Sequence, residues 1–310
     1  MRRHGILIVE DDYLLAAELG ATIQRAGNLL VGPAPSIDQA LRLLQDGAVV
    51  DAAILDIHLR DEMVFPVADA LTARGAPFLF ITGHDSVVPE RFIQAALCKK
   101  PLVPKQVRFE LQRVLDPPWF VAIGASGADG LVDLCALLGA LPAGLNAAFL
   151  VVLHRGWGVS SSLCKILARA GPHRVVVARP GIRLEPGRVY IGEPSRHLVL
   201  GRRSDSEVID DPDRIHGGRT VDLLFHSVAG CAGARTIGVV LSGGLDDGSR
   251  GLAAIHQAGG RAMVVQAHSE LGSGMPTHAM ARVSGVNLVG TPSELAREIA
   301  LITRGLAWPH

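Results

Sequence analysis

Apolar runs alternate with amphipathic segments along the first third of the chain. Five runs of aliphatic and β-branched residues predict strands, and their near-continuous apolar character is typical of a parallel sheet that is covered on both faces. These runs are residues 5–10, 28–34, 51–56, 76–83 and 95–100. Segments 13–27 and 36–47 repeat their apolar residues with a helical period, and 104–115 predicts a last helix. We therefore expect a strand and a helix repeated five times, folded as a doubly wound α/β sheet.

A second alternation of strands and helices begins directly after Asp116-Pro117-Pro118. Proline cannot continue a helix, so this corner ends the first series. The clearest apolar runs of the second series are 119–126, 147–154, 174–179, 188–193, 236–243 and 261–267. Helical patterns occur at 161–171, 220–233 and 251–260. The sequence thus predicts two domains, 1–116 and 117–310, both doubly wound α/β folds, with a mainly parallel sheet in the second.

Composition narrows the class of protein. The 310 residues include 30 acidic and 30 basic side chains, so no broad positive charge is present to bind nucleic acid. The four cysteines are scattered without the spacing of a metal site, which favours reduced thiols. The first apolar run stops at Glu10, too early for a signal peptide, and no other run approaches a membrane span. We expect a cytoplasmic protein that neither binds nucleic acid nor inserts into a membrane.

Charged and hydroxyl side chains follow the predicted strands of the first domain. In such sheets reactive groups gather beyond the carboxyl ends of the strands. The residues at these ends are Glu10, Asp11, Asp12, Asp56, Thr82 and Lys100. Converging carboxylates repel one another unless a hard cation joins them, and Mg²⁺ prefers oxygen ligands. A lysine and a hydroxyl aimed at the same point would hold a phosphoryl group. The alternative, acids that merely begin a helix, explains the acidic run but none of the other strand ends.

Four motifs of the first domain, "LIVEDD", "AILDIHL", "FITG" and "KKP", occur in this order. They resemble the receiver domain of two-component response regulators, which has a flavodoxin-like doubly wound fold, and the resemblance covers residues 1–115. It implies that Asp56 accepts a phosphoryl group from a sensor histidine kinase and that Thr82 and Lys100 contact the phosphoryl oxygens. The magnesium ligands that it implies are Asp11, Asp12 and Asp56.

The stretch "WFVAIGASGADGLVDLCALL" places Ser126 where a predicted strand meets a predicted helix. A serine needs a base, and the base an orienting acid, before it attacks a carbonyl carbon. His154 ends the next predicted strand, and Asp246-Asp247 follow the strand at 236–243. Parallel pairing would deliver all of them to one edge of the sheet. Glycines flank Asp247, and a backbone N–H in such a turn can face an oxyanion.

Motifs of the second domain, among them "IGAS", "VVLHRG", "TVDLLFHSVA" and "GVVLSGGLDDGSRGL", carry a second resemblance. From about residue 120 to 302 the chain resembles the catalytic domain of the chemotaxis protein-glutamate methylesterases, a family in which a receiver precedes this domain. The resemblance implies a phosphorylation-regulated hydrolase of glutamyl methyl esters on methylated chemoreceptors, with deamidation of glutamine as a companion activity and no cofactor in this domain. The catalytic residues that it implies are Ser126, His154 and Asp247. The residues that it places beside the oxyanion or the substrate are Gly127, Gly244 and Arg219.

The chain departs from the family pattern at three points. The turn after Ser126 gains one residue and an acid, Asp129, while Gly244 replaces a methionine and Arg219 precedes a threonine instead of a proline. Asp129 motivates the alternative of a catalytically weakened fold that acts as a phosphorylation-dependent binding module, because a negative charge opposes an oxyanion. If Asp129 is instead a helix N-cap that points into solvent, it does no harm.

Other interpretations of the second domain fit less well. The turn "GASGADG" resembles that of short-chain dehydrogenases, but a dinucleotide site wants an acid after the next strand, where the chain has His154-Arg155. The dehydrogenase pattern Tyr-x-x-x-Lys is also absent. A DNA-binding domain would be basic and contain a recognition helix, and neither signal is present. Three further histidines are expected on the surface or in packing, not as bases: His197, His216 and His226. Ser242 is a candidate for a hydrogen bond within the site.

The stiff corner between the two predicted domains bears on regulation. It predicts that the unphosphorylated first domain partly covers the catalytic cleft. Phosphorylation of Asp56 would add negative charge, engage Lys100 and shift the population towards an open arrangement. Receivers often carry an aromatic switch residue three places before this lysine, and the chain has Leu97 there. A smaller response than an aromatic residue would give is therefore expected.

Overall fold

The protein is described by a computed structural model that covers residues 3–83, 87–154, 162–192, 196–211, 218–244, 246–266 and 274–305. The chain divides into two compact units, Met1–Pro117 and Pro118–His310. The division falls between the two prolines of the Asp116-Pro117-Pro118 corner. Each unit contains hydrophobic core clusters built from its own residues alone.

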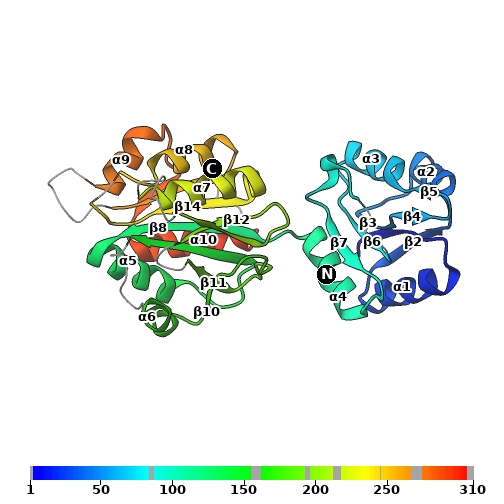
Figure 1. The fold of residues 1–310 in the computed structure, drawn as a ribbon, viewed down its shortest axis with the longest axis horizontal. Helices are drawn as coiled ribbons and strands as arrows, with labels where there is room; N and C mark the ends of the chain where they lie inside the picture. The colour runs from blue at the N-terminus through cyan, green and yellow to red at the C-terminus, as the bar shows by residue number, and fades with distance from the viewer. Residues whose placement is uncertain are drawn as a thin grey trace. The chain divides into compact units, whose positions relative to one another are not determined.

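The first unit is built on a five-stranded parallel sheet (Figure 1). Its strands are β1 (Gly5–Val9), β2 (Leu29–Ala34), β3 (Ala52–Asp56), β6 (Phe78–Thr82) and β7 (Ala96–Lys99). They lie in the order β2-β1-β3-β6-β7, which is the flavodoxin-like order of a doubly wound sheet. A short antiparallel ladder, β4 (His58–Leu59) with β5 (Glu62–Met63), follows β3. The chain order reverses at β1, so the carboxyl ends of β1 and β3 border the crevice where such folds bind ligands.

Helices cover both faces of this sheet. On one face α1 (Tyr13–Arg25) and α4 (Pro104–Leu115) pack against the even-numbered residues of β1 and β3, such as Ile8 and Ile54. On the other face α2 (Ile37–Gln45) and α3 (Phe65–Ala73) pack against odd-numbered residues, such as Leu7. The predicted fold class is therefore present in this unit.

The connection between β6 and β7 differs from the expected fifth repeat. Its described residues form only a 3-10 turn, η1 (Glu90–Phe92), so the expectation of five strand-helix repeats is wrong. Pro89 precedes the turn, and the segment holds no amphipathic run long enough for a helix. Instead Phe92 anchors the connection, because its ring stacks on Phe65 and contacts Phe78 and Phe80 edge-on with centroids 5.7–6.0 Å apart.

The second unit is built on a seven-stranded sheet whose neighbouring strands are all parallel. In spatial order the strands are β10 (Arg174–Val177), β11 (Arg188–Ile191), β9 (Ala147–His154), β8 (Trp119–Ser126), β14 (Thr236–Val240), β15 (Arg261–Val265) and β16 (Leu288–Gly290). The chain begins the sheet at β8, adds strands on one side, and then returns to the other side at β14. The carboxyl ends of β8, β9 and β14 thus surround the switch point.

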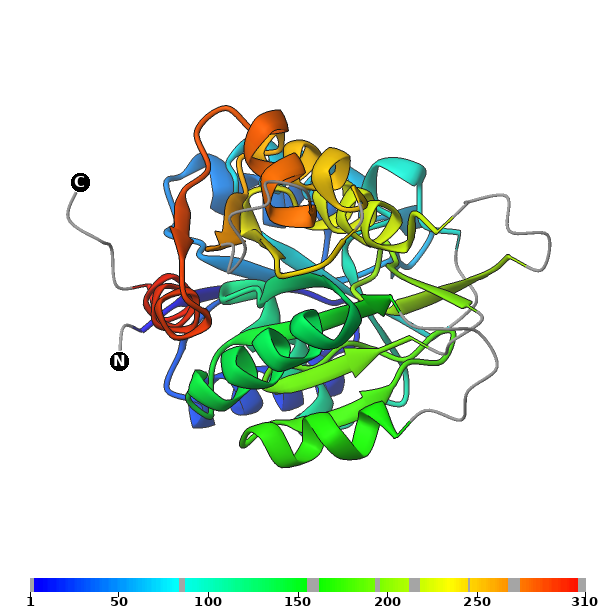
Figure 2. The same cartoon turned by 90° about the vertical axis from the view of Figure 1, so that its left-hand side faces the viewer.

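Helices of the described residues cover both faces of this sheet (Figure 2). One face carries α5 (Gly127–Ala140), α6 (Leu163–Ala170) and α10 (Pro292–Thr303). The opposite face carries α7 (Thr220–Ala232), α8 (Ser249–Gln257) and α9 (Met275–Arg282). Even-numbered residues of β8 and β9, such as Ala122 and Leu150, point to the second face. This alternation decides where the residues that end these strands project.

A separate antiparallel hairpin, β12 (Arg196–Leu200) with β13 (Ser206–Asp210), was not expected from the sequence. It lies against α7, where Leu200 N–H donates to Ser227 Oγ at 2.9 Å. A short 3-10 turn, η2 (Gly233–Arg235), connects α7 to β14. Across the described ranges, no helix has both the length and the apolar composition needed to cross a bilayer.

Candidate functional site

Ser126 is the last residue of β8 and the N-cap of α5. Its N–H donates to Ser242 O at 3.0 Å, while its hydroxyl makes no capping hydrogen bond to the helix. The next residue, Gly127, has a φ of 72°, a left-handed conformation that glycine adopts without strain. The chain therefore turns sharply from strand to helix and leaves the serine hydroxyl available for chemistry.

Close packing fixes this turn against the segment that follows β14. A side chain at Gly130 would meet Ser242 O at 2.5 Å, and one at Gly243 would meet the Cβ of Ser126 at 2.6 Å. Asp133 of α5 is buried, and its carboxylate accepts the N–H of Ser242 at 3.2 Å. The backbone on both sides of Ser126 is thus held by hydrogen bonds and by glycines that allow close approach.

His154 is the last residue of β9 and the direct partner of Ser126 in the parallel ladder. Both residues have the parity of Ala122 and Leu150, so their side chains project towards the face covered by α7. The side chain of His154 is 16% exposed, and its Nε2 lies 2.6 Å from Asp247 Oδ2. Because Nε2 engages the carboxylate, Nδ1 is the ring nitrogen left to accept a proton.

Asp247 follows β14 and is 3% exposed. Besides the bond to His154, its Oδ2 accepts Val221 N–H at 2.8 Å and its Oδ1 accepts Asp222 N–H at 2.8 Å. These two N–H groups belong to the first turn of α7, whose N-cap residue, Arg219, makes no side-chain capping bond. The carboxylate therefore caps the helix from outside, and the positive end of the helix dipole stabilises its charge.

Asp222 lies beside this carboxylate and is buried as well. Burial raises the pKa of Asp222 above its ordinary value, the charge of Asp247 raises it further, and the hydrogen bond from Gly251 N–H at 2.7 Å opposes the rise. Two neighbouring acids therefore lie at the first turn of α7, Asp222 within the helix and Asp247 outside it, and Asp247 accepts the helix N–H groups and bonds to His154.

The other predicted residues of this site lie around the same strand ends. Gly127 and Gly244 are exposed, and added side chains there would meet nothing within 4 Å, so both backbones are open to a ligand. Arg219 is half-buried. Asp129 is exposed in the first turn of α5, but the N-cap position belongs to Ser126, not to Asp129. The roles of these residues in oxyanion or substrate binding stay predictions.

The acidic pocket of the first unit brings together residues from the carboxyl ends of β1, β3, β6 and β7. One oxygen from each of Glu10, Asp11 and Asp56 lies within 4.8 Å of the others. Lys100 Nζ donates to Glu10 Oε2 at 3.0 Å and to Asp56 Oδ2 at 2.6 Å. Thr82 is buried at the end of β6, and its carbonyl oxygen accepts the N–H of Lys100 at 2.8 Å.

Burial and mutual charge perturb the groups of this pocket. Burial and the charge of Asp56 raise the pKa of Glu10 to about 7. Burial alone would lower the pKa of Lys100, but its hydrogen bonds to Asp56 and Glu10 raise it above its ordinary value. A divalent cation would relieve the repulsion among the carboxylates, and the oxygen-only donor set suits Mg²⁺.

The acids that converge differ from the predicted set by one residue. Asp12 is exposed and caps α1, with Oδ1 accepting Leu14 N–H at 2.8 Å and Leu15 N–H at 3.0 Å. Glu10, which is 2% exposed, takes its place beside Asp11 and Asp56. Glu10 has the parity of Ile8 in β1, so the alternation of the strand already directs it to the face that Asp56 shares. That parity is the signal from which Glu10 could have been found.

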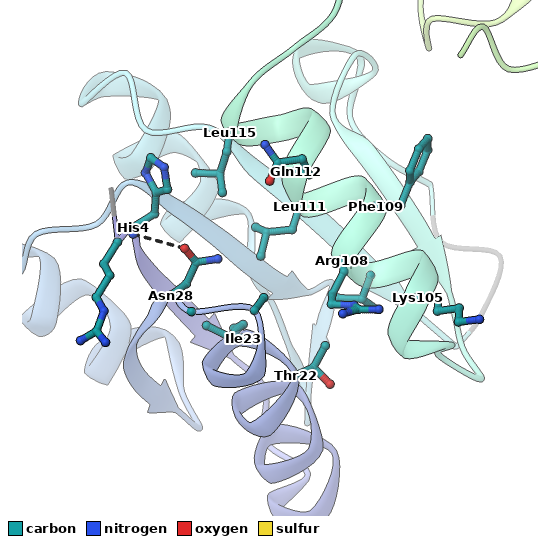
Figure 3. A pocket seen from close by; sticks show the side chains of 14 residues that line it. His4, Thr22, Ile23, Asn28, Lys105, Arg108, Phe109, Leu111, Gln112 and Leu115 are labelled. Carbon is teal, nitrogen blue, oxygen red and sulfur yellow. Dashed lines mark hydrogen bonds between the residues drawn. The ribbon is translucent and has the colours of Figure 1, made fainter. Parts of the chain in front are cut away.

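A cavity of about 800 Å³ lies elsewhere in the first unit, between α1 and α4 (Figure 3). Its wall includes apolar residues such as Ile23 and Leu111, and Lys105 and Arg108 of α4 lie at its side. His4 N–H donates to Asn28 Oδ1 at 3.3 Å at its other end. None of its lining residues belongs to the acidic pocket.

Several residues that the sequence did not identify as part of the site make hydrogen bonds to the segments that hold Ser126 and Asp247. Asp133 and the first turn of α7 have been described, and His197 of β12 is a further case. It is buried, as expected for a packing residue, but both of its ring nitrogens are hydrogen-bonded. His226 is exposed on α7. Arg155 and His216 lie outside the described residues.

A serine at a strand-to-helix turn, with a histidine and a buried aspartate at the neighbouring strand ends, defines an α/β protein with a Ser-His-Asp arrangement at the switch point of a parallel sheet. The family model of the CheB methylesterases matches residues 121–299. The chain therefore belongs to the CheB methylesterase family.

Individual relatives agree with this assignment. Protein-glutamate methylesterase/protein-glutamine glutaminase 3 of Anaeromyxobacter dehalogenans is 39% identical over 59% of this chain and 54% of its own length. The protein of the same name, without the number, from Yersinia pestis bv. Antiqua is 33% identical over 69% of this chain and 62% of its own. The crystal structure of the Thermotoga maritima CheB methylesterase catalytic domain matches with a TM-score of 0.54 and 26% identity, covering 60% of this chain and 98% of that one. The chain thus spans between half and two thirds of the length of these two curated relatives.

Proposed function

We propose that the chain hydrolyses glutamyl methyl esters on chemoreceptor-like proteins, with Ser126 as nucleophile, His154 as base and Asp247 as the acid that orients it. The observation that carries the proposal is the ladder pairing of Ser126 with His154, together with the 2.6 Å bond from His154 Nε2 to Asp247 Oδ2. Membership of the CheB methylesterase family supports the ester as the substrate class.

In the acylation step the hydroxyl of Ser126 loses its proton to His154 as the oxygen bonds to the ester carbonyl carbon. Nδ1 receives this proton because Nε2 is held by Asp247. The charge that develops on the imidazolium is stabilised by Asp247, whose own charge the α7 N–H groups hold in place. The bond to the methoxy group then breaks, and the departing oxygen takes the proton from His154 as methanol leaves.

Deacylation repeats these events with water. His154 takes a proton from the water as its oxygen bonds to the acyl carbon, and the bond to Ser126 breaks while the serine regains a proton. The products are the free enzyme and a glutamate carboxylate. The start of α5 contributes the positive end of a helix dipole near the oxyanion. We assign Gly127 and Gly244 as N–H donors there, because their backbones are exposed beside Ser126 and the turn that packs on it.

Deamidation of glutamine is a second activity of the same site. The two relatives with the names given above are called protein-glutamine glutaminases as well as methylesterases. The same acyl-enzyme would form from a glutaminyl amide, with ammonia in place of methanol as the leaving group.

The first unit regulates this activity through phosphorylation of Asp56. Its carboxylate ends β3, and Lys100 lies 2.6 Å from it, where the ammonium group would neutralise a phosphoryl oxygen. Thr82, at the adjacent strand end, offers a hydroxyl to the same group. Glu10, Asp11 and Asp56 would hold Mg²⁺, which would neutralise charge on the phosphoryl group during its transfer. The methylesterase domain requires no cofactor for the steps above.

The proposed partners are a sensor histidine kinase as phosphodonor and a methylated chemoreceptor as substrate. We place the reaction in the cytoplasm, since all four cysteines of the chain are free thiols, as a reducing compartment would keep them.

A methanol-release assay on methylated chemoreceptor, with and without phosphorylation of Asp56, tests the proposal. Release that rises on phosphorylation supports it. No release under either condition from a folded protein would overturn the esterase assignment and leave a phosphorylation-dependent binding module, the role that Asp129 motivates.

A further inference from the structure

A second histidine-centred network lies behind the first turn of α7. His197 of β12 is 5% exposed, and Asp211, directly after β13, is 3% exposed. His197 Nε2 lies 3.1 Å from Asp211 Oδ2, and His197 Nδ1 lies 3.1 Å from Oγ1 of Thr220. With Nε2–H donated to Asp211, the neutral ring accepts at Nδ1, so the hydroxyl of Thr220 donates to it.

Thr220 is the first residue of α7. The next two residues, Val221 and Asp222, supply the N–H groups that hold Asp247. The N-cap residue of this helix makes no side-chain capping bond, so the first turn depends on groups outside the helix, of which Asp247 is one. Helix ends fray unless their backbone groups are tied down. The hydrogen bond from Thr220 to His197 ties this end to the hairpin.

The rest of the hairpin is fastened to the same helix further along. Leu200 N–H donates to Ser227 Oγ at 2.9 Å, and the thiol of Cys231 donates to Leu200 O at 3.3 Å. These bonds secure the middle and end of α7, whereas His197 reaches its beginning. The hairpin is therefore hydrogen-bonded to the start, middle and end of α7. Its His197 contacts the first turn, whose N–H groups bind Asp247.

We propose that His197, held by Asp211 and bonded to Thr220, is a positioning residue that fixes the first turn of α7 and thereby the orientation of Asp247 and His154. Both ring nitrogens of His197 are engaged, so it acts through the helix and not as a second base. The part of the inference that concerns catalysis rests on the proposed esterase function. The part that concerns the alignment of His154 does not.

The hairpin offers a matched pair of variants for the test. Asp210 and Asp211 are neighbours, but Asp210 is exposed and pairs with Arg196, while Asp211 is buried and pairs with His197. Asp211→Asn weakens the hold on His197, and Asp210→Asn weakens only an exposed ion pair, which contributes little. Thr220→Val removes the hydroxyl at nearly constant shape, and Thr220→Ser restores it.

The first readout does not depend on turnover. In the full chain labelled at histidine Cε1, NMR titration gives the ionisation midpoint of His154, assigned by its loss in His154→Gln. Asp222 and His226 of α7 are further titratable groups, and Asp222 interacts with Asp247. All variants keep both residues, so that they do not contribute to a difference in the midpoint of His154. We expect Asp211→Asn and Thr220→Val to lower the midpoint of His154 by roughly 0.5 to 1 pH unit, because a loosened Asp247 stabilises the imidazolium less. Asp210→Asn and Thr220→Ser should leave it in place.

The second readout is turnover of a peptide that carries a glutamyl methyl ester. The same two variants should lose about ten- to a hundredfold in kcat with little change in KM, since misalignment acts on the chemical step. An unchanged His154 midpoint in Asp211→Asn and Thr220→Val would overturn the inference, as would an equal shift in Asp210→Asn. If Thr220→Val fails to fold, the comparison of Asp211→Asn with Asp210→Asn decides alone. If the two variants shift the His154 midpoint but the wild-type chain releases no methanol, the proposed function is refuted and the positioning role stands.

Discussion

Ser126 and His154 occupy the last positions of two neighbouring parallel strands and are direct partners in the ladder that joins them. Register partners project from the same face of a sheet, here the face on which α7 holds Asp247. The proposed nucleophile and the proposed base thus occupy paired positions that strand register alone sets. Loops supply neither residue, which favours a rigid arrangement.

Replacing the nucleophile gives the most direct prediction. Ser126→Ala should lower turnover of a glutamyl methyl ester by roughly a thousandfold or more, as removal of a triad member does elsewhere. Ser162→Ala is the matched control, because Ser162 also precedes a helix and makes no side-chain capping bond but has no hydrogen bond to His154 or Asp247 in the described residues. Near-normal methanol release from Ser126→Ala would refute the assignment of the nucleophile.

A comparison of the adjacent residues Asp246 and Asp247 tests which of them orients His154. Asp247 is buried with bonds to His154 and two N–H groups, whereas Asp246 is exposed. Asp247→Asn should cut kcat by about 10⁴, since an amide cannot stabilise the imidazolium and favours the wrong tautomer. Asp246→Asn should retain activity. Equal losses in both variants would mean that general charge near the turn, and not orientation of His154, is what matters.

Magnesium binding distinguishes the acids that converge from the one that caps a helix. Glu10→Gln and Asp11→Asn should each weaken Mg²⁺ binding by roughly tenfold or more in calorimetric titration, because each removes a charged oxygen ligand. Asp12→Asn should bind Mg²⁺ normally and keep its stability, as asparagine caps helices about as well as aspartate. If Asp12→Asn weakens binding as much as Asp11→Asn, the ligand set predicted from the sequence is correct and the convergence of Glu10 is incidental.

The buried carboxyl of Asp222 predicts a pH-dependent stability. Burial first, and then the charge of Asp247, raise its pKa above the ordinary value of 3.8. The folded protein therefore binds this proton more tightly than the unfolded chain, so the stabilising contribution is present at low pH and is lost as pH rises through the folded pKa. Asp222→Asn removes this dependence, and its free energy of unfolding relative to wild type should increase between about pH 4 and pH 7.

Urea midpoints at both pH values measure the effect for Asp222. Asp210→Asn is the control, because the hydrogen bond to Arg196 lowers the pKa of Asp210 and the contribution of its charge is therefore already present above the ordinary value of 3.8. The difference in stability between Asp210→Asn and wild type should stay nearly constant over the same rise in pH. A stability difference between Asp222→Asn and wild type that stays constant with pH would contradict the prediction.

Most of the fold follows from local patterns. The apolar runs at strands such as β1 and β8 are long and flanked by amphipathic helices, so both doubly wound sheets could be predicted. The β12–β13 hairpin could not, since its short strands resemble any half-buried loop and its place is set by packing on α7. The absence of a helix in the described connection between β6 and β7 could have been predicted from Pro89 and the lack of an amphipathic run, but the packing of Phe92 against Phe78 and Phe80 could not.

The sites show the same division between local and tertiary information. Residues that end strands, such as Ser126, His154 and Asp56, could be proposed because strand ends meet at one edge of a parallel sheet. The parity of β1 could also have indicated Glu10, but the departure of Asp12 from the predicted set could not be read from the sequence, because it depends on the cap that Asp12 forms on α1. The start of α7 binds Asp247 through the backbone N–H groups of Val221 and Asp222. Nearly every residue carries such a group, so no pattern of side chains in the sequence indicates this contact.

The last prediction concerns regulation by the first unit. Each unit has its own hydrophobic clusters, so the second should fold when residues 1–116 are removed. If the unphosphorylated first unit partly covers the catalytic cleft, as the short proline corner suggests, this deletion should raise the basal rate of methanol release. Asp56→Asn should keep the basal rate of the full chain and abolish only its response to phosphorylation, because the phosphoryl group adds about 1.5 to 2 negative charges at this position alone. An isolated second unit that is no faster than the unphosphorylated chain would refute covering and leave the first unit a role in targeting.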